Sequence, residues 1–179
     1  MILFLDFDGV LHPEPCYDDG QLFSCLPRLE SVLRDFTGVQ IVISSTWREK
    51  YSLSELKTFF SADIATRIVG VTPVWQKIPE IVDAVGYQRH AEIEGWLRQS
   101  GEPWRSWLAI DDKSYLFKPF LKNLIKTNSL IGILHEDLLH QAGFLVKLLQ
   151  LSIHDLGENS FRLSRLLSLI HKNLSLSCK

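Results

Sequence analysis

The sequence is poor in cysteine, in long apolar runs and in surplus positive charge. Its three cysteines, Cys16, Cys25 and Cys178, form no CxxC pair, so neither a disulfide framework nor a cysteine zinc site is indicated. With 19 Lys and Arg against 21 Asp and Glu, the net charge of −2 argues against a protein dedicated to binding duplex nucleic acid, although a local basic patch is still allowed. No apolar run approaches membrane-spanning length, and Asp6 and Asp8 interrupt the apolar N-terminus too early for a signal peptide. We therefore expect a cytoplasmic protein.

The composition is otherwise that of a globular protein. Of the 179 residues 46% are apolar, with 10 Gly and 7 Pro, which excludes collagen, a coiled coil and a disordered chain. This length supports one domain with a sizeable core and a short appendage.

Short apolar runs alternate with segments of helical periodicity. Strands are predicted over residues 2–5, 39–43, 68–72 and 107–110, with a fifth at 123–127, and helices over 26–36, 53–60 and 88–99. Ser52 is the predicted N-cap of the second helix. This alternation is typical of the α/β class, so we expect a doubly wound, Rossmann-like, mainly parallel five-stranded sheet with helices on both faces.

The chain changes composition after residue 150. Residues 1–150 carry the predicted strands and helices, whereas residues 151–179 are rich in Leu and Ser. The apolar spacing from Leu163 to Leu174 predicts an amphipathic helix there. Such a helix could pack on the domain, stay partly ordered, or contact a membrane surface or a partner.

Polar residues follow three of the predicted strands. Asp6 and Asp8 come after the first, the serines and threonine at 44–46 after the second, and Asp111 and Asp112 after the fourth. Ligands of a parallel sheet bind beyond the carboxyl ends of its strands, so these side chains should converge. An isolated DxDG motif more often forms a turn or a cap. Four clustered carboxylates, however, repel one another unless a cation compensates them, and hard oxygen ligands suit Mg²⁺.

Four segments carry a family resemblance, in the family's own order. LFLDFDGVL, IVIS, a basic residue ahead of a later helix, and WLAIDD resemble the motifs of the haloacid dehalogenase-like (HAD) phosphohydrolase superfamily. The resemblance extends over roughly residues 1–150. SSTWRE and RHAEIEGWL further resemble a capless subgroup whose domain also occurs in multidomain RNA-repair proteins. This implies a phosphatase that acts on phosphate esters.

The resemblance implies a role for each acidic residue. Asp6 would be the nucleophile that becomes an aspartyl phosphate. Asp8 would protonate the leaving group and then deprotonate the hydrolytic water. Mg²⁺ would be held by Asp6, by the carbonyl of Asp8, and by Asp111 or Asp112, between which the sequence does not choose.

Phosphate-binding residues are implied in the same way. Ser44, with Ser45 beside it, would bind the transferring phosphoryl group. The basic residue of the third motif would be Arg89, with Lys77 as its competitor. Arg48 follows the phosphate-binding strand and could grip the substrate. Its neighbour Trp47 could do the same, although a tryptophan there is more often part of the core.

The short stretch between Asp8 and Ser44 leaves no room for the large cap domain of many relatives. An open site is implied, and capless relatives tend to act on bulky substrates such as nucleic-acid ends, proteins or phospholipid-like groups. Residues 12–15 would be a small flap or an ordinary surface loop. The lysines after Asp112 would form a positive rim or be scattered surface charges: Lys113, Lys118, Lys122 and Lys126.

Two other function classes remain in view. A signalling receiver module also places an acidic pair after its first strand, but its phosphoacceptor Asp should end a strand near the middle of the chain, where this sequence has Ser44 and Thr72. A catalytically silent HAD-like module would keep the fold for binding a partner. The oligomeric state is not readable from the sequence.

Overall fold

A five-stranded parallel sheet forms the centre of the protein. The structure, a computed structural model, describes residues 1–78 and 86–133. The strands lie in the order β3-β2-β1-β4-β5, and every pair of neighbours is parallel. Their bounds are β1 Ile2–Leu5, β2 Gln40–Ile43, β3 Ile68–Val71, β4 Trp107–Asp111 and β5 Leu124–Lys126. The predicted fold class is therefore confirmed.

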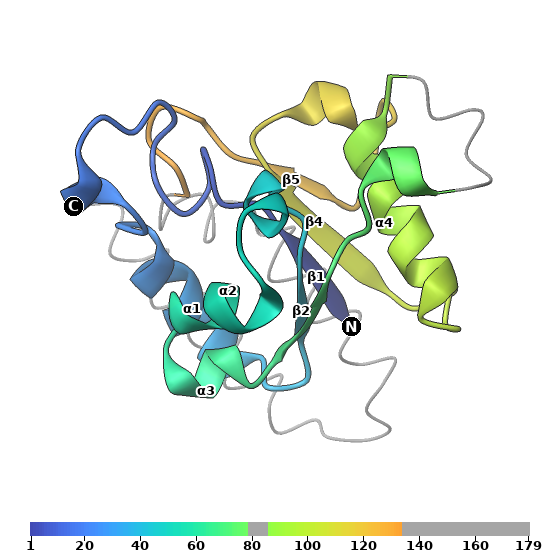
Figure 1. Cartoon of the computed structure of the whole chain (residues 1–179), viewed down its shortest axis with the longest axis horizontal. Helices are drawn as coiled ribbons and strands as arrows, with labels where there is room; N and C mark the ends of the chain where they lie inside the picture. Colours follow the sequence, from blue (N-terminus) through green and yellow to red (C-terminus); the bar gives the residue numbers. More distant parts are fainter. Residues whose placement is uncertain (79–85, 134–179) are drawn as a thin grey trace, which may run out of the picture.

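Helices cover both faces of the sheet (Figure 1). One face carries α1 (Leu26–Asp35), α2 (Leu53–Thr58) and α3 (Ala62–Ala65), and the other carries α4 (Gln88–Gln99). Within the described part of the chain, four short 3-10 helices lie in the connections: η1 (Asp19–Gln21), η2 (Thr46–Glu49), η3 (Trp75–Lys77) and η4 (Ser114–Leu116). The connection from β1 to β2 contains η1 and α1 and no other helix or strand, so no large cap is present between Asp8 and Ser44.

The central strand β1 is an unbroken apolar run because both of its faces are buried. Leu3 and Leu5 belong to the core beneath α1–α3, whereas Ile2 and Phe4 belong to the core beneath α4. This is the alternation that the pleat of a strand imposes. All four side chains are fully buried.

The predicted helix over residues 53–60 is shorter in the structure and is followed by a second helix. It begins as predicted, with Ser52 as N-cap in a capping box with Glu55. The backbone N–H of Ser61 donates to Oε1 of Glu30 in α1 at 2.8 Å instead of to a preceding carbonyl. Since a helix continues only through such backbone bonds, this contact separates α2 from α3.

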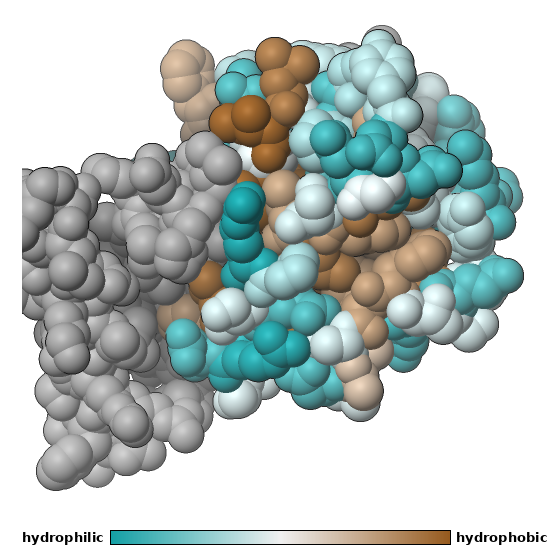
Figure 2. Space-filling view, turned by 90° about the vertical axis from the view of Figure 1, so that its left-hand side faces the viewer, coloured by the Kyte–Doolittle hydropathy of each residue, from teal (hydrophilic) through white to brown (hydrophobic). Residues whose placement is uncertain are grey.

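The surface of the described part mixes hydrophilic and hydrophobic side chains. Figure 2 shows one side on which hydrophilic residues are widespread and hydrophobic residues lie in separate areas among them. In residues 1–78 and 86–133, no helix is long and apolar enough to cross a membrane. The predicted boundary at residue 150 and the predicted helix from Leu163 to Leu174 lie outside the described residues.

Candidate active site

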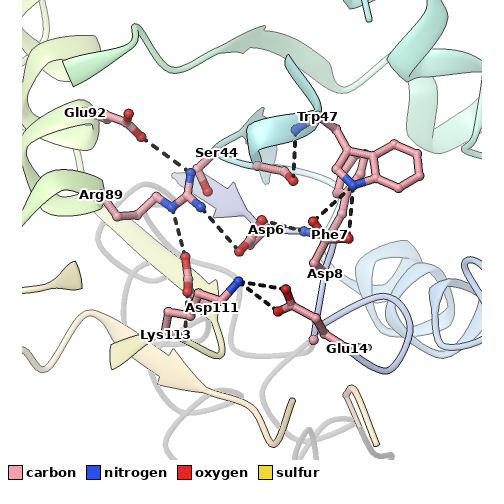
Figure 3. A network of polar contacts seen from close by, with 12 residues as sticks. Asp6, Phe7, Asp8, Glu14, Ser44, Trp47, Arg89, Glu92, Asp111 and Lys113 are labelled. Atoms are coloured by element: carbon pink, nitrogen blue, oxygen red, sulfur yellow. Dashed lines mark hydrogen bonds and ion pairs between the residues drawn. The ribbon is translucent and has the colours of Figure 1, made fainter. Parts of the chain in front are cut away.

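The carboxyl ends of β1, β2 and β4 meet at one edge of the sheet. Leu5 pairs with Ile43 on one side and with Ile110 on the other, so Asp6, Ser44 and Asp111 follow at the same level of three neighbouring strands. From β1 the chain continues toward β2, whereas from β4 it continues toward β5 on the opposite side. Such a reversal is where α/β sheets bind ligands. Figure 3 shows the polar side chains gathered there.

Three carboxylates form an acidic cluster at this edge: Asp6, Asp111 and Asp112. One carboxylate oxygen from each of the three residues lies within 4.8 Å of one carboxylate oxygen from each of the other two. Among the described residues, Oδ1 of Asp112 is buried and has no hydrogen-bond partner. A buried, unpartnered carboxylate oxygen is costly unless it binds a cation. The donor set therefore fits Mg²⁺, which prefers oxygen ligands. The carboxylate of Asp8 is not part of this cluster.

Arg89 lies against this cluster. It is buried at the start of α4, where its Nη2 is 3.4 Å from Oδ2 of Asp6 and its Nε is 3.1 Å from Oδ2 of Asp111. Its competitor Lys77 is exposed at the end of η3. The sequence left Arg89 and Lys77 as alternatives for the basic residue of the third motif. Of the two, Arg89 lies beside the predicted nucleophile Asp6.

Glu92 joins Arg89 to Arg48, and sequence reasoning missed it. Its Oε2 is 3.4 Å from Nη1 of Arg89 and its Oε1 is 2.6 Å from Nη2 of Arg48. Nη1 of Arg48 donates to the carbonyls of Ser44 and Ser45, at 3.0 and 2.7 Å. The side chain of Arg48 is only 3% exposed. Its guanidinium N–H groups therefore link the end of β2 to α4 rather than face solvent. The only sequence signal for Glu92 is its position three residues after Arg89, on the same face of a helix.

Burial governs the ionisation of the acidic cluster. Burial and the neighbouring Asp6 charge raise the pKa of Asp111 to about 7, although Arg89 opposes the shift. Burial also raises the pKa of Asp6, against the effects of Arg89, the Phe7 backbone N–H and Ser45. The pKa of Asp112 is raised for the same first reason. A bound cation would favour the ionised form of all three.

The two carboxylate oxygens of Asp6 have different partners. Its Oδ1 accepts a hydrogen bond from the backbone N–H of Phe7 at 2.8 Å, and its Oδ2 is the oxygen that faces Arg89. Ser44 and Ser45 are both buried beside it at the end of β2. The Ser45 hydroxyl also accepts the backbone N–H of Trp47 at 3.4 Å, so it caps η2.

Asp8 is bound by two side chains from different loops. Nε1 of Trp47 lies 3.0 and 3.1 Å from its two carboxylate oxygens, and Nε2 of His12 lies 3.1 Å from Oδ1. Burial alone would raise the pKa of Asp8, but the hydrogen bonds from His12 and Trp47 outweigh it, and the pKa is lowered. Trp47 is therefore a polar partner of the site as well as part of the core, and no local pattern in the sequence indicates its contact with Asp8.

Gly9 allows the turn after β1 to pass close to Asp112. It has a φ of +68°, and its carbonyl accepts a hydrogen bond from the Thr127 hydroxyl at 2.8 Å. A Cβ atom at this position would lie 2.6 Å from Cγ of Asp112. Glycine is thus required both by the backbone conformation and by the close approach.

The predicted positive rim is partly neutralised. Lys113 pairs with Glu14 of the predicted flap, its Nζ lying 2.8 Å from Oε2, and Lys118 pairs with Glu94 at 3.1 Å. The Glu14 contact ties residues 12–15 to the loop after β4, as Figure 3 shows. Lys122 and Lys126 follow further along the chain, and Lys126 is exposed in β5.

A family model matches most of the chain. The model of a family described as the HAD domain in Swiss Army Knife RNA repair proteins matches residues 2–138, which is more than half of the chain. No curated protein and no solved structure matches. The matched range includes every residue placed in the site above.

Proposed function

Because the chain belongs to the family of HAD domains found in Swiss Army Knife RNA repair proteins, we propose that it is a Mg²⁺-dependent phosphatase that hydrolyses phosphate esters through an aspartyl-phosphate intermediate. One observation carries the proposal. A carboxylate directly after the central strand, Asp6, is buried against Arg89 and two further carboxylates. The guanidinium of Arg89 beside the nucleophile, and carboxylates that can hold Mg²⁺, supply the positive charge that stabilises a transferring phosphoryl group.

In the first step, an oxygen of Asp6 attacks phosphorus and forms a P–O bond while the bond to the leaving oxygen breaks. Asp8 gives its proton to that oxygen, so the leaving group departs as an alcohol. Arg89 offsets negative charge on the phosphoryl group and on Asp6. Glu92 and Arg48 hold Arg89 and the end of β2 in place for this step.

In the second step, Asp8 accepts a proton from water, and the water oxygen attacks the phosphorus of the aspartyl phosphate. The bond to Asp6 breaks, inorganic phosphate is released, and Asp8 is again protonated. Ser44 and Ser45 bind the phosphoryl oxygens during both steps. When bound by Asp6, Asp111, Asp112 and the Asp8 carbonyl, Mg²⁺ would supply the positive charge that lets phosphate approach the carboxylates.

We further propose a nucleic-acid end as the substrate. The absence of a large cap between Asp8 and Ser44 supports it, because a bulky phosphorylated chain then needs no enclosing domain to open. The RNA-repair setting of the matched family supports it as well.

Phosphate release from an aryl phosphate, with and without Mg²⁺, tests the proposed activity. The Asp6→Asn variant keeps the shape of the side chain but removes the nucleophile, so we expect a loss of about 10³-fold or more in kcat. Asp35→Asn, at the exposed end of α1, is the matched control and should keep full activity. Release without Mg²⁺, or by Asp6→Asn at the wild-type rate, would contradict the mechanism, and no release by the wild type would favour a silent binding module.

A further inference from the structure

We propose that Trp47 and His12 are positioning residues that hold the Asp8 carboxylate so that its Oδ2 exchanges the proton with the leaving group. The inference rests on the proposed role of Asp8 as general acid and base. It assigns a task to two side chains that the motifs of the site do not include. The task is orientation, since neither residue needs to touch the substrate.

The hydrogen bonds distinguish the two oxygens of Asp8. Each carboxylate oxygen can accept two hydrogen bonds. Oδ1 accepts hydrogen bonds from both Trp47 Nε1 at 3.0 Å and His12 Nε2 at 3.1 Å. Among the residues that the structure describes, Oδ2 is reached only by Trp47, at 3.1 Å. Oδ2 therefore keeps capacity for one more partner. The proton that Asp8 exchanges with the leaving group is carried at this position on Oδ2.

The Trp47 indole is itself fixed in place. Its ring packs against Phe7 at a centroid distance of 5.7 Å, against Phe23 at 5.4 Å and against Phe59 at 5.7 Å, and it stacks on Tyr51 at 5.5 Å. One stacked and three edge-type aromatic contacts restrict rotation of the ring. The N–H is thus aimed at Asp8 before any substrate binds.

His12 is held in one tautomer by its surroundings. The side chain is 2% exposed, and within residues 1–78 and 86–133 its Nδ1 has no hydrogen-bond partner. A proton on Nδ1 would be a buried donor without an acceptor, so the ring proton belongs on Nε2, where Asp8 accepts it. His12 thereby donates its Nε2 proton to Asp8.

Orientation matters because the carboxylate of Asp8 is 27% exposed and would otherwise rotate. Proton transfer needs the two oxygens within about 3 Å of each other. The effect of misplacement depends on the leaving group. An alkyl alkoxide must be protonated as it leaves, whereas 4-nitrophenolate is stable enough to leave without a proton.

The test compares an alkyl phosphate with 4-nitrophenyl phosphate for the wild type and Trp47→Phe, which keeps an aromatic ring but lacks the N–H. The second step, in which Asp8 acts as a base, is the same for both esters, so the first step is measured alone, as phosphorylation of Asp6 in a single turnover followed by rapid quenching. We expect its rate to fall about 10-fold or more for the alkyl ester and to change by less than about 3-fold for the nitrophenyl ester. Tyr51→Phe alters the same aromatic cluster without touching Asp8 and should leave both rates unchanged. His12→Gln keeps a donor and should retain more alkyl-ester activity than His12→Leu.

Equal losses of this first-step rate on the two esters, or no loss on either, would overturn the positioning role while the phosphatase proposal stands. A wild type that hydrolyses neither ester would overturn the proposed function and this inference with it. Thermal unfolding of each variant identifies a loss of activity that comes from misfolding. If Trp47→Phe misfolds, the comparison of His12→Gln with His12→Leu decides. Only the positioning role predicts a higher rate for Gln than for Leu with the alkyl ester and no such difference with the nitrophenyl ester.

Discussion

A Cβ methyl group added at Gly9 would contact Asp112 of the acidic cluster. The residue combines a φ of +68° with a distance of 2.6 Å from the position of a Cβ to Cγ of Asp112. The conformation is costly for any residue with a side chain, and the contact would push Asp112 away from Asp6 and Asp111.

We therefore expect Gly9→Ala to lower the free energy of unfolding by about 1–2 kcal/mol and to raise the Mg²⁺ concentration needed for half-maximal activity. Urea denaturation and a Mg²⁺ titration of the activity measure the two effects. Gly38→Ala is the control, since no atom lies within 4 Å of a Cβ placed there. An unchanged Mg²⁺ requirement in Gly9→Ala would show that Asp112 does not bind the metal.

The sequence predicted single residues only where a local pattern identifies them. Asp6, Asp8 and the glycine after them stand in one short motif. Glu92 and the indole N–H of Trp47 become polar partners through contacts with residues 44 and 39 positions away in the chain. No local pattern encodes such pairings, because they depend on how separate segments of the chain pack together.

At the scale of elements, β1 depends on aromatic packing beneath α4. Phe4 is fully buried and meets Trp96 and Trp107 edge-on, at centroid distances of 5.7 and 5.8 Å. These contacts join the central strand to α4 and β4, which carry Arg89 and Asp111.

Phe4→Ala should lower the free energy of unfolding by about 3–5 kcal/mol, because it leaves a cavity between strand and helix. Denaturation in urea measures the loss. Phe120→Ala removes an equal side chain from a fully exposed position and should change the value by no more than about 0.5 kcal/mol. A similar small change for Phe4→Ala would mean that this core is not packed as described.

The elements themselves were predictable because their signals are local. Runs such as residues 2–5 and 107–110 are buried on both faces, so they appear as continuous apolar stretches. The division between α2 and α3 was not predictable, since it depends on Glu30, a residue of another helix, capturing the N–H of Ser61.

On the scale of the whole molecule, strand order brings the site together. The reversal between β1 and β4 places the acidic cluster at the switch point, and no large cap stands between Asp8 and Ser44. The sequence indicated a parallel sheet and the absence of a cap by its spacing. It did not contain the order β3-β2-β1-β4-β5, because strand neighbours are chosen by packing between distant segments.

If the substrate is a nucleic-acid end, an oligonucleotide carrying a terminal phosphate should give a higher kcat/KM than the matching mononucleotide. The preference should weaken with salt, with a logarithmic slope of about −0.7 for each additional phosphate contacted. Steady-state kinetics at two or more salt concentrations measure this. Equal or better use of the mononucleotide, insensitive to salt, would remove nucleic acid as the substrate and leave the phosphatase proposal intact.

The central claim is that Asp6 becomes phosphorylated during turnover, and rapid quenching tests it most directly. With a ³²P-labelled phosphate ester and Mg²⁺, we expect label to appear on the protein before the steady state, to be released by hydroxylamine as an acyl phosphate is, and to map to Asp6 by mass spectrometry. Asp6→Asn should carry none. Label on another residue, or phosphate released by a wild type that never becomes labelled, would contradict the account.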